Sequence, residues 1–230
     1  MTGRRRIQDF PKTSWLNQAA RGLLALKKQP AATKYLDYQI QTVLSLPFTG
    51  EWYVYWGGRT IAQNYHSAYR DQRFAYDFMI LGNGKSHSGT GKDNADYFCF
   101  GRPILAPGAG QVVGAGNEES DRTPGTMLTE NPLGNHVIID HGCSEFSFLA
   151  HLRQGSVTVR PGDTVTLGQP LGECGNSGHS SEPHLHYHLQ TTAVPFRGDG
   201  LPAQFLDYVA NGSAIARGEP LAGQNVRNSA

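Results

Sequence analysis

Residues 182–190 read EPHLHYHLQ and place three histidines, His184, His186 and His188, at every second position. Successive side chains of a β-strand point to opposite faces, so this spacing puts all three imidazoles on one face. A lone histidine is usually a polar residue satisfied by its neighbours, whereas three on one face are a stronger signal. The stretch therefore predicts a β-strand with a chemical site along one side.

Seven short runs from residue 51 onward are rich in β-branched or aromatic residues and are bounded by Gly, Pro, Asn or Asp. They are EWYVYWGG (51–58), FAYDFMIL (74–81), GQVVGAG (110–116), NHVIIDHG (135–142), SFLAHL (147–152), SVTVRPGDTV (156–165) and PHLHYHL (183–189). Such a series predicts an all-β core of packed antiparallel sheets, of sandwich or barrel type. Polar, glycine-rich stretches at 83–98 and 115–134 predict long loops that border a cleft.

The chain has 230 residues, enough for one large domain or two small ones and for a substantial core. Residues 15–28, WLNQAARGLLALKK, have the apolar spacing of a short amphipathic helix, which Pro30 would end. We therefore expect an N-terminal helical and extended segment over 1–45 and a main β domain over 46–195. A C-terminal extension over 196–230 is expected to pack along an edge of that domain.

The charge and hydropathy patterns bound the classes of partner. A formal net charge of +1 gives no overall attraction to nucleic acid or to an acidic membrane, so no nucleic-acid partner is expected. No segment is long and apolar enough to span a bilayer. The N-terminal region shows no secretory signal, because GLLAL is short and is followed directly by KKQP.

The three cysteines, Cys99, Cys143 and Cys174, form no Cys-x-x-Cys pair. This excludes a zinc ribbon, and an odd number of cysteines argues against a disulfide framework. A single pair between Cys143 and Cys174 is left open by the sequence.

A hydrolytic zinc site typically takes three protein ligands from His and Asp or Glu and keeps a fourth position for water. One strand with alternating histidines supplies one or two of these, so partners must come from elsewhere. Candidates are His66, Asp71 and Asp77 in NYHSAYRDQRFAYDFMIL, and His151 in FLAHLRQGSV. Asp77 lies inside an apolar strand, where a carboxylate is costly to bury unless it is paired or bound to a metal.

Over residues 60–192 the sequence resembles the LytM/lysostaphin-type zinc metallopeptidases. The resemblance runs through NYHSAYRDQRFAYDF, GRPILAPGAGQVV, GNHVIIDHG and AHLRQGSVTVRPGDTVTLGQPLGECGNSGHSSEPHLHYHL. It implies a duplicated hybrid-motif β fold and a zinc-dependent endopeptidase that hydrolyses peptide bonds in bacterial peptidoglycan. It also implies action in the cell envelope or outside the cell.

The resemblance further implies one zinc ion held by His66, Asp77 and His186. His151 and His184 would flank the reacting carbonyl and share the work of general base, proton donor and oxyanion stabiliser. The metal would acidify a water molecule and polarise the scissile carbonyl.

One departure concerns the carboxylate ligand. Many members of the family place the aspartate four residues after the first histidine. Here Asp77 comes eleven residues after His66, which makes Asp71 a rival ligand. Asp77 is preferred because AYDF leads directly into a strand, whereas RDQR reads as a charged turn. His188 is expected to be a neighbour of the site and not a third histidine ligand.

Three other classes are weighed against the peptidase. The hairpin VRPGDTVTLGQPLG resembles that of lipoyl and biotinyl carrier domains, but no lysine lies between residues 93 and 230 to carry the group. A histidine phosphocarrier would need neither Asp77 nor a metal triad. A non-catalytic cell-wall-binding module of the same fold commonly lacks a ligand, whereas here all five site positions are filled.

Overall fold

The computed structural model describes residues 29–127 and 130–229. Its regular elements are thirteen β-strands and two short 3₁₀ helices. In chain order they are β1 (Trp52–Trp56), η1 (Tyr65–Ala68), β2 (Tyr76–Met79), η2 (Asn94–Asp96), β3 (Pro103–Leu105), β4 (Gly110–Gly116), β5 (Asn135–Asp140), β6 (Phe146–Leu152), β7 (Thr164–Val165), β8 (Pro170–Glu173), β9 (Leu185–Gln190), β10 (Gly200–Leu201), β11 (Phe205–Ala210), β12 (Ser213–Gly218) and β13 (Asn225–Asn228).

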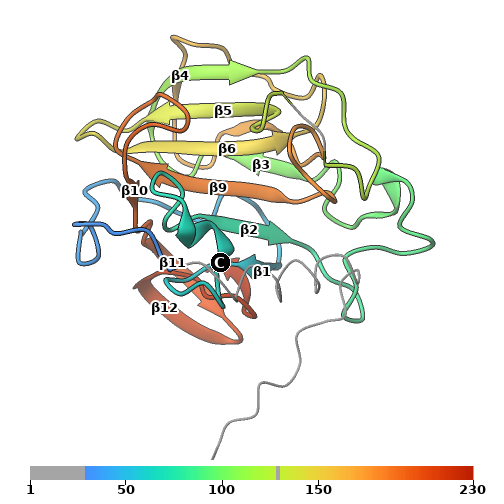
Figure 1. Ribbon diagram of the computed structural model, residues 1–230, viewed down its shortest axis with the longest axis horizontal. Coiled ribbons are helices and arrows are strands. Elements are labelled where there is room, and N and C mark those ends of the chain that lie inside the picture. Colours follow the sequence, from blue (N-terminus) through green and yellow to red (C-terminus); the bar gives the residue numbers. More distant parts are fainter. Residues whose placement is uncertain (1–28, 128–129, 230) are drawn as a thin grey trace, which may run out of the picture.

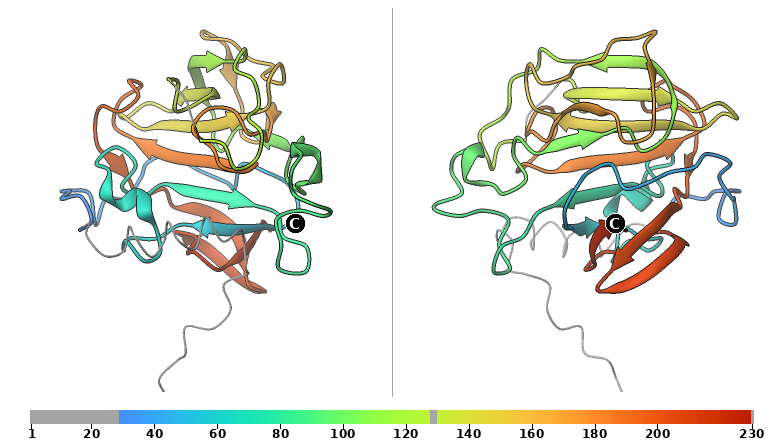
Figure 2. Two further views of the ribbon diagram at one scale, coloured as in Figure 1. Left: turned by 45° about the vertical axis from the view of Figure 1, so that its right-hand side comes forward. Right: turned by 180° about the vertical axis from the view of Figure 1, so that it is seen from behind.

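Eleven of the strands form one large sheet in the order β12-β11-β13-β1-β2-β9-β6-β5-β4-β7, with β10 paired to β9. Every strand pair in it is antiparallel. Figure 1 shows the strands stacked from β4 at the top to β1 and the β11–β12 hairpin at the bottom, and Figure 2 shows the same stack from two further sides. Strands β3 and β8 form a separate two-stranded sheet.

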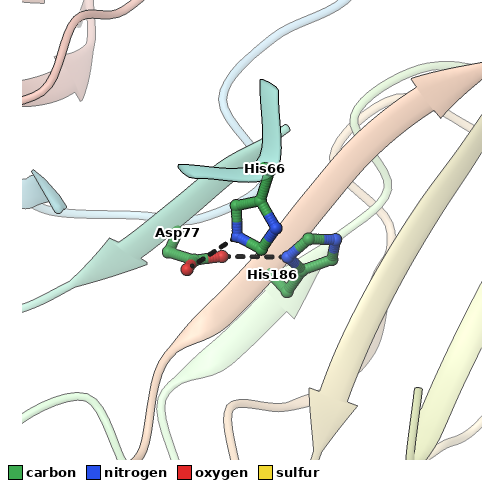
Figure 3. Close-up of side chains that lie close together, drawn as sticks. All are labelled: His66, Asp77 and His186. Carbon is green, nitrogen blue, oxygen red and sulfur yellow. Dashed lines mark hydrogen bonds and ion pairs between the residues drawn. The ribbon is translucent and has the colours of Figure 1, made fainter. Parts of the chain in front are cut away.

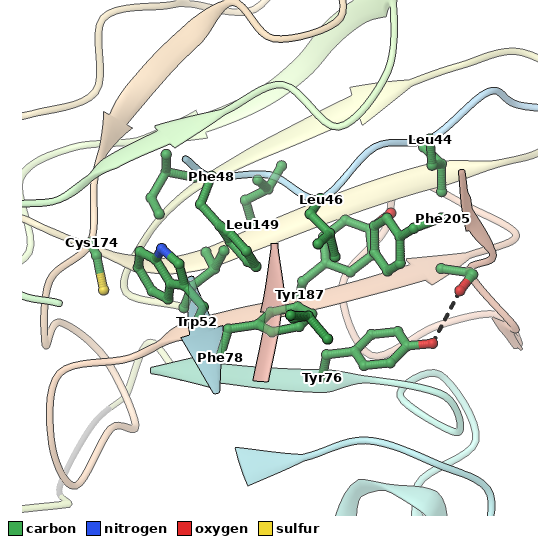
Figure 4. Packing of buried hydrophobic residues seen from close by; sticks show 14 of the residues in the cluster. Leu44, Leu46, Phe48, Trp52, Tyr76, Phe78, Leu149, Cys174, Tyr187 and Phe205 are labelled. Atoms are coloured by element: carbon green, nitrogen blue, oxygen red, sulfur yellow. Dashed lines mark hydrogen bonds between the residues drawn. The ribbon is translucent and has the colours of Figure 1, made fainter. Parts of the chain in front are cut away.

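The centre of the large sheet is covered on both faces. Every residue of β1, β2 and β9 is buried, so polar side chains on these strands are buried as well as apolar ones. On one face of β9, Leu185, Tyr187 and Leu189 enter the main hydrophobic core. Figure 4 shows Tyr187 packed there among Tyr76, Phe78 and Phe205. The opposite face of β9 carries His186 and His188, and His184 directly precedes the strand.

The predicted all-β antiparallel class is confirmed, although several elements differ from the runs read in the sequence. Of the run at 156–165 only Thr164–Val165 forms a strand, because Pro161 and Gly162 interrupt its pairing. The runs gave no sign of β3, β8 or the strands after residue 196, which are short or weakly apolar. The helix predicted over 15–28 lies outside the described residues.

Residues after 196 extend the sheet instead of forming a separate layer. Strand β13 pairs with β1, and β11 pairs with both β13 and β12. The Asn228 side chain then joins this extension to the chain before β1, since Nδ2 donates to the carbonyls of Leu46 and Phe48 at 3.1 and 2.9 Å. The C-terminal extension and the strand that leads towards Asp77 thus share one continuous ladder.

Glu145 fixes the chain that precedes β1 onto the β5–β6 turn. Its carboxylate is fully buried and accepts from the Tyr38 hydroxyl at 3.0 Å, from the backbone N–H groups of Gln41 and Thr42 at 2.8 and 2.9 Å, and from the Thr42 hydroxyl. Hydrogen bonds to a charged acceptor stabilise more than neutral ones do, so one side chain secures residues 38–42.

We expect Glu145→Ala to lower the free energy of unfolding by about 3 kcal/mol, because several donors lose their acceptor together. Tyr38→Phe, which removes one of these donors, should cost about 1 kcal/mol. Urea unfolding followed by circular dichroism measures both. Equal losses for the two variants would contradict the role given to the carboxylate.

The three cysteines are all described, and all are free. Cys143 is exposed beside Gln41, whereas Cys174 is fully buried in the core, so the pair left open by the sequence does not form. Among residues 29–127 and 130–229, no helix is long and hydrophobic enough to cross a bilayer.

Candidate functional site

Strand register brings the first two site residues together. Asp77 on β2 lies directly opposite His186 on β9, so their side chains emerge on the same face of the sheet. On the other flank of β9, the residue opposite His186 is Ala150 of β6, whose methyl group leaves room for the imidazole. The pairing therefore fixes a carboxylate next to an imidazole inside the sheet, where both are buried.

His66 reaches the same point from the short helix η1. Asn64 caps that helix, because its Oδ1 accepts from the His66 N–H at 3.1 Å. Its Nδ2 donates to the carbonyls of Gly58 and Ala75 at 3.1 and 2.9 Å. Asn64 thus holds the His66 turn against both the end of β1 and the start of β2. This places an imidazole from a loop over two strands.

The three groups form one cluster, shown in Figure 3, in which the Asp77 carboxylate lies beside the two imidazoles and is linked to each of them. Asp77 Oδ2 is 3.0 Å from His66 Nε2, and Asp77 Oδ1 is 2.9 Å from His186 Nδ1. One ligand atom from each residue lies within 4.8 Å of those of the others. Among the described residues this is the group of His, Cys, Asp and Glu side chains whose spacing suits a metal ion.

Burial and neighbouring charges set the electrostatics of the cluster. Burial by itself would raise the pKa of Asp77, but His66 and His184 nearby and hydrogen bonds from His186 and His66 hold it well below its usual value. Burial lowers the pKa of His186 to about 4, against the opposing hydrogen bond with Asp77. A divalent cation would take the place of the protons that now link the carboxylate to these imidazoles.

His151 and His184 lie beside this cluster, with their ring centroids 4.8 Å apart. His151 Nδ1 donates to the carbonyl of Ser177 at 2.9 Å, and His184 Nδ1 donates to that of Glu182 at 2.8 Å. Because a carbonyl can only accept, both Nδ1 atoms carry the proton and both Nε2 atoms keep a lone pair. His184 Nε2 is 3.7 Å from Asp77 Oδ1, so it faces the cluster.

The position of His151 depends on a bulge in β6. Its φ is +64°, in the left-handed region that non-glycine residues seldom adopt, and the pairing with β5 shifts register next to it. Phe148 and Ala150 pack on the site side of the sheet, whereas Leu149 and Leu152 both lie in the main core. The bulge therefore breaks the alternation and sends His151 to the site side. Such strained backbone is often found at functional sites.

A cavity of about 540 Å³ opens beside the cluster. Asp77, His151 and His184 lie in its wall, and aromatic side chains supply much of the rest. The aromatic members are Tyr55, Trp56, Tyr65, Tyr69 and Tyr97. Gly91 and Pro124 also line it, so both of the predicted loops, 83–98 and 115–134, border a cleft as expected.

A second, smaller cavity of about 70 Å³ lies on the other side of the cluster. His66 and His186 line it, and Tyr65, His151 and His179 are shared with the larger cavity. The cluster thus borders both cavities. His179 lines both as well, although no sequence motif marks it.

Asp71, the rival carboxylate, lies outside the metal-spaced group. It contacts the side chain of Gln72, whose hydrogen bond lowers the pKa of Asp71 against the larger raising effect of burial. Gln72 Oε1 in turn accepts from His66 Nδ1 at 3.0 Å, which leaves the lone pair of His66 on Nε2. Asp71 is therefore connected to His66 only through the Gln72 side chain.

The donor set fits a zinc ion. Two neutral imidazoles and one carboxylate are ligands that zinc accepts, and three protein ligands leave a position open for chemistry. The buried carboxylate is also the kind of group that is costly to hold in a sheet without a cation. His66 Nε2, His186 Nδ1 and one Asp77 oxygen are the atoms that would hold the metal.

Residues 90–197 match the model of Peptidase family M23. The chain contains a Peptidase family M23 domain. The resemblance stated from the sequence is thereby confirmed, and the match includes His151, His184 and His186. It begins after His66 and Asp77, so the place of these two residues beside His186 comes from the fold.

Two curated relatives illustrate the similarity. The chain is 34% identical over 97 residues to "Peptidoglycan DD-endopeptidase ShyA" of Vibrio cholerae. This alignment covers 42% of the chain and 19% of the relative. It is 30% identical over 163 residues to "Glycyl-glycine endopeptidase ALE-1" of Staphylococcus capitis. This second alignment covers 67% of the chain and 40% of the relative. The chain therefore spans less than half of the length of either relative.

Among solved structures, the chain is similar to the catalytic domain of the antimicrobial peptidase lysostaphin from Staphylococcus simulans. The identity is 21%, the TM-score is 0.39, and the alignment covers 67% of this chain and 89% of that one.

The metal-free protein should lose stability in mild acid. Because the pKa of His186 in the folded state is about 4 and an unfolded histidine titrates near 6.5, the unfolded chain binds more protons between these values. Stability should therefore fall as the pH drops from 6.5 to 5.0, by about 1.5 kcal/mol from His186 alone. Urea unfolding of chelator-treated protein at the two pH values measures this difference.

His186→Ala, which lacks this imidazole, is the control and should show a smaller loss over the same interval. A free energy of unfolding of the unmodified protein that is the same at both pH values would contradict the prediction.

Proposed function

We propose that the protein is a zinc-dependent metalloendopeptidase that hydrolyses peptide bonds in the cross-links or bridges of peptidoglycan. The observation that carries the proposal is the buried Asp77 carboxylate beside His66 and His186, with His151 and His184 next to them at the wall of a cleft. The match to Peptidase family M23 and the names of the two relatives support the substrate class.

The roles of the ligands follow from their hydrogen bonds. His66 would hold the metal through Nε2, because Gln72 occupies its Nδ1, and His186 would hold it through Nδ1. Asp77 would contribute one oxygen and the negative charge. When bound, zinc supplies a Lewis acid that polarises a carbonyl and acidifies water.

His151 and His184 have the arrangement of an acid–base pair. Each has Nδ1–H anchored on a backbone carbonyl and presents the lone pair of Nε2, so each can take a proton at that atom. One of them would take a proton of the attacking water at Nε2 and deliver it to the amine nitrogen as the carbon–nitrogen bond breaks. The other, protonated on Nε2 from solvent, would donate a hydrogen bond to the developing oxyanion.

The larger cavity is the place for the substrate chain. Its volume of about 540 Å³ and its aromatic wall suit several residues of an extended peptide. Residues 46–195 are proposed as the catalytic domain, with the flanking segments 1–45 and 196–230 as its extensions. Action in the cell envelope or outside the cell follows from the substrate, since peptidoglycan lies there.

Digestion of purified peptidoglycan, followed by mass determination of the products, tests the function. We expect new amino and carboxyl ends from cleaved cross-links or bridges, and we expect a chelator to abolish them until zinc is restored. A preparation that carries one zinc ion per chain yet releases no product would favour a binding module and contradict the proposed enzyme.

Two substitutions separate metal binding from proton transfer. His186→Ala should reduce the zinc content from one ion per chain to roughly a tenth or less, since a ligand is removed. His151→Ala should keep the zinc and lower turnover by about 10²–10⁴-fold, because it removes an acid–base group. Atomic absorption and product release measure the two effects. Equal zinc content in the unmodified protein and in His186→Ala would overturn the ligand assignment.

A further inference from the structure

The third histidine of the alternating series lies directly behind the proposed ligand His186. His188 Nδ1 is 3.0 Å from His186 Nε2, whereas the other nitrogen of His186, Nδ1, faces Asp77. His188 is therefore on the side of His186 that points away from the metal-spaced group, and it is not a member of that group. Its ring is buried and stacks on Phe148 with centroids 4.6 Å apart and planes at 15°.

The proposed metal contact sets the direction of the hydrogen bond between the two imidazoles. A nitrogen that binds a metal must offer its lone pair, so His186 would bind through a deprotonated Nδ1 and carry its proton on Nε2.

His188 Nδ1, which is 3.0 Å from His186 Nε2, is then the acceptor and His188 carries its own proton on Nε2. Metal binding would thereby replace the hydrogen bond that His186 Nδ1 makes to Asp77 in the metal-free protein. The ring of His66 is oriented by a side-chain acceptor too, since Gln72 Oε1 accepts from its Nδ1–H. The two histidines thus present different nitrogens to one point.

We propose that His188 is a positioning residue that holds His186 in its Nε2–H tautomer and directs Nδ1 at the metal. The inference rests on the proposed zinc site and adds to it the part that orients one ligand. A metal-ligating histidine usually donates its other N–H to a partner that fixes the ring and raises its basicity, and loss of such a partner costs about 10–100-fold in affinity. Here the partner is a second imidazole.

The test compares zinc affinity in two variants at the same position. His188→Phe keeps a flat ring against Phe148 but removes the acceptor, and we expect the zinc dissociation constant to rise about 10–100-fold. His188→Asn places an amide oxygen close to the position of Nδ1 and should bring the constant back to within about threefold of the unmodified protein. Competition with a chromophoric chelator measures the constant without use of activity.

His141→Phe is the matched control. It removes another half-buried imidazole with two hydrogen bonds, to the carbonyl of Ala109 and the hydroxyl of Ser147 at 2.7 Å each, but it is not in the metal-spaced group. Its zinc affinity should equal that of the unmodified protein. A loss as large as that of His188→Phe would assign both effects to general destabilisation and overturn the proposal.

A measurement on the unmodified protein keeps the test independent of whether His188→Phe folds. Long-range ¹H–¹⁵N correlation spectra of the zinc-loaded protein should show both His186 and His188 protonated on Nε2. Protonation of His188 on Nδ1 would overturn the proposal. Absence of zinc binding in the unmodified protein would overturn the proposed function itself, whereas zinc binding that His188→Phe leaves unchanged would overturn only the role of His188.

Discussion

The constraint on which the site depends is the burial of the Asp77 carboxylate in the middle of an antiparallel sheet. A charge there is costly to desolvate, and the structure offsets this with imidazoles on two sides, from His66 and His186. The hydrogen bonds that orient those imidazoles extend outward to Gln72 and to His188. The polar network is thus centred on Asp77 and is surrounded by apolar strands.

The large sheet serves this network in two ways. Its register puts Asp77 opposite His186, and its small residue at Ala150 leaves space on the other flank. A bulge at the end of β6 turns His151 onto the face that carries the other histidines. A regular strand would have sent that imidazole into the hydrophobic core. Regular pairing and a local irregularity therefore both contribute to the arrangement.

The acid–base pair and the ligands are held by different means. His151 and His184 are anchored on backbone carbonyls, which are rigid acceptors fixed by the neighbouring loops. His66 and His186 are anchored on side chains, so their orientation depends on further contacts behind them. This difference explains why a residue such as His188, which lines neither cavity, bears on the candidate metal site.

The sequence by itself determined the strand character, the common face of His184, His186 and His188, and the need of Asp77 for a partner, because these follow from local periodicity and from the cost of burying a charge. It did not determine strands such as β3 and β12, whose pairing depends on distant neighbours. Only the tertiary structure decided between Asp71 and Asp77 as the carboxylate beside His66. His66 and Asp77 meet despite the eleven-residue interval because η1 folds back over β2. No local sequence pattern encodes this contact. The hydrogen bond from His186 to His188, and the cleft beside them, likewise exist only where separate strands and loops meet.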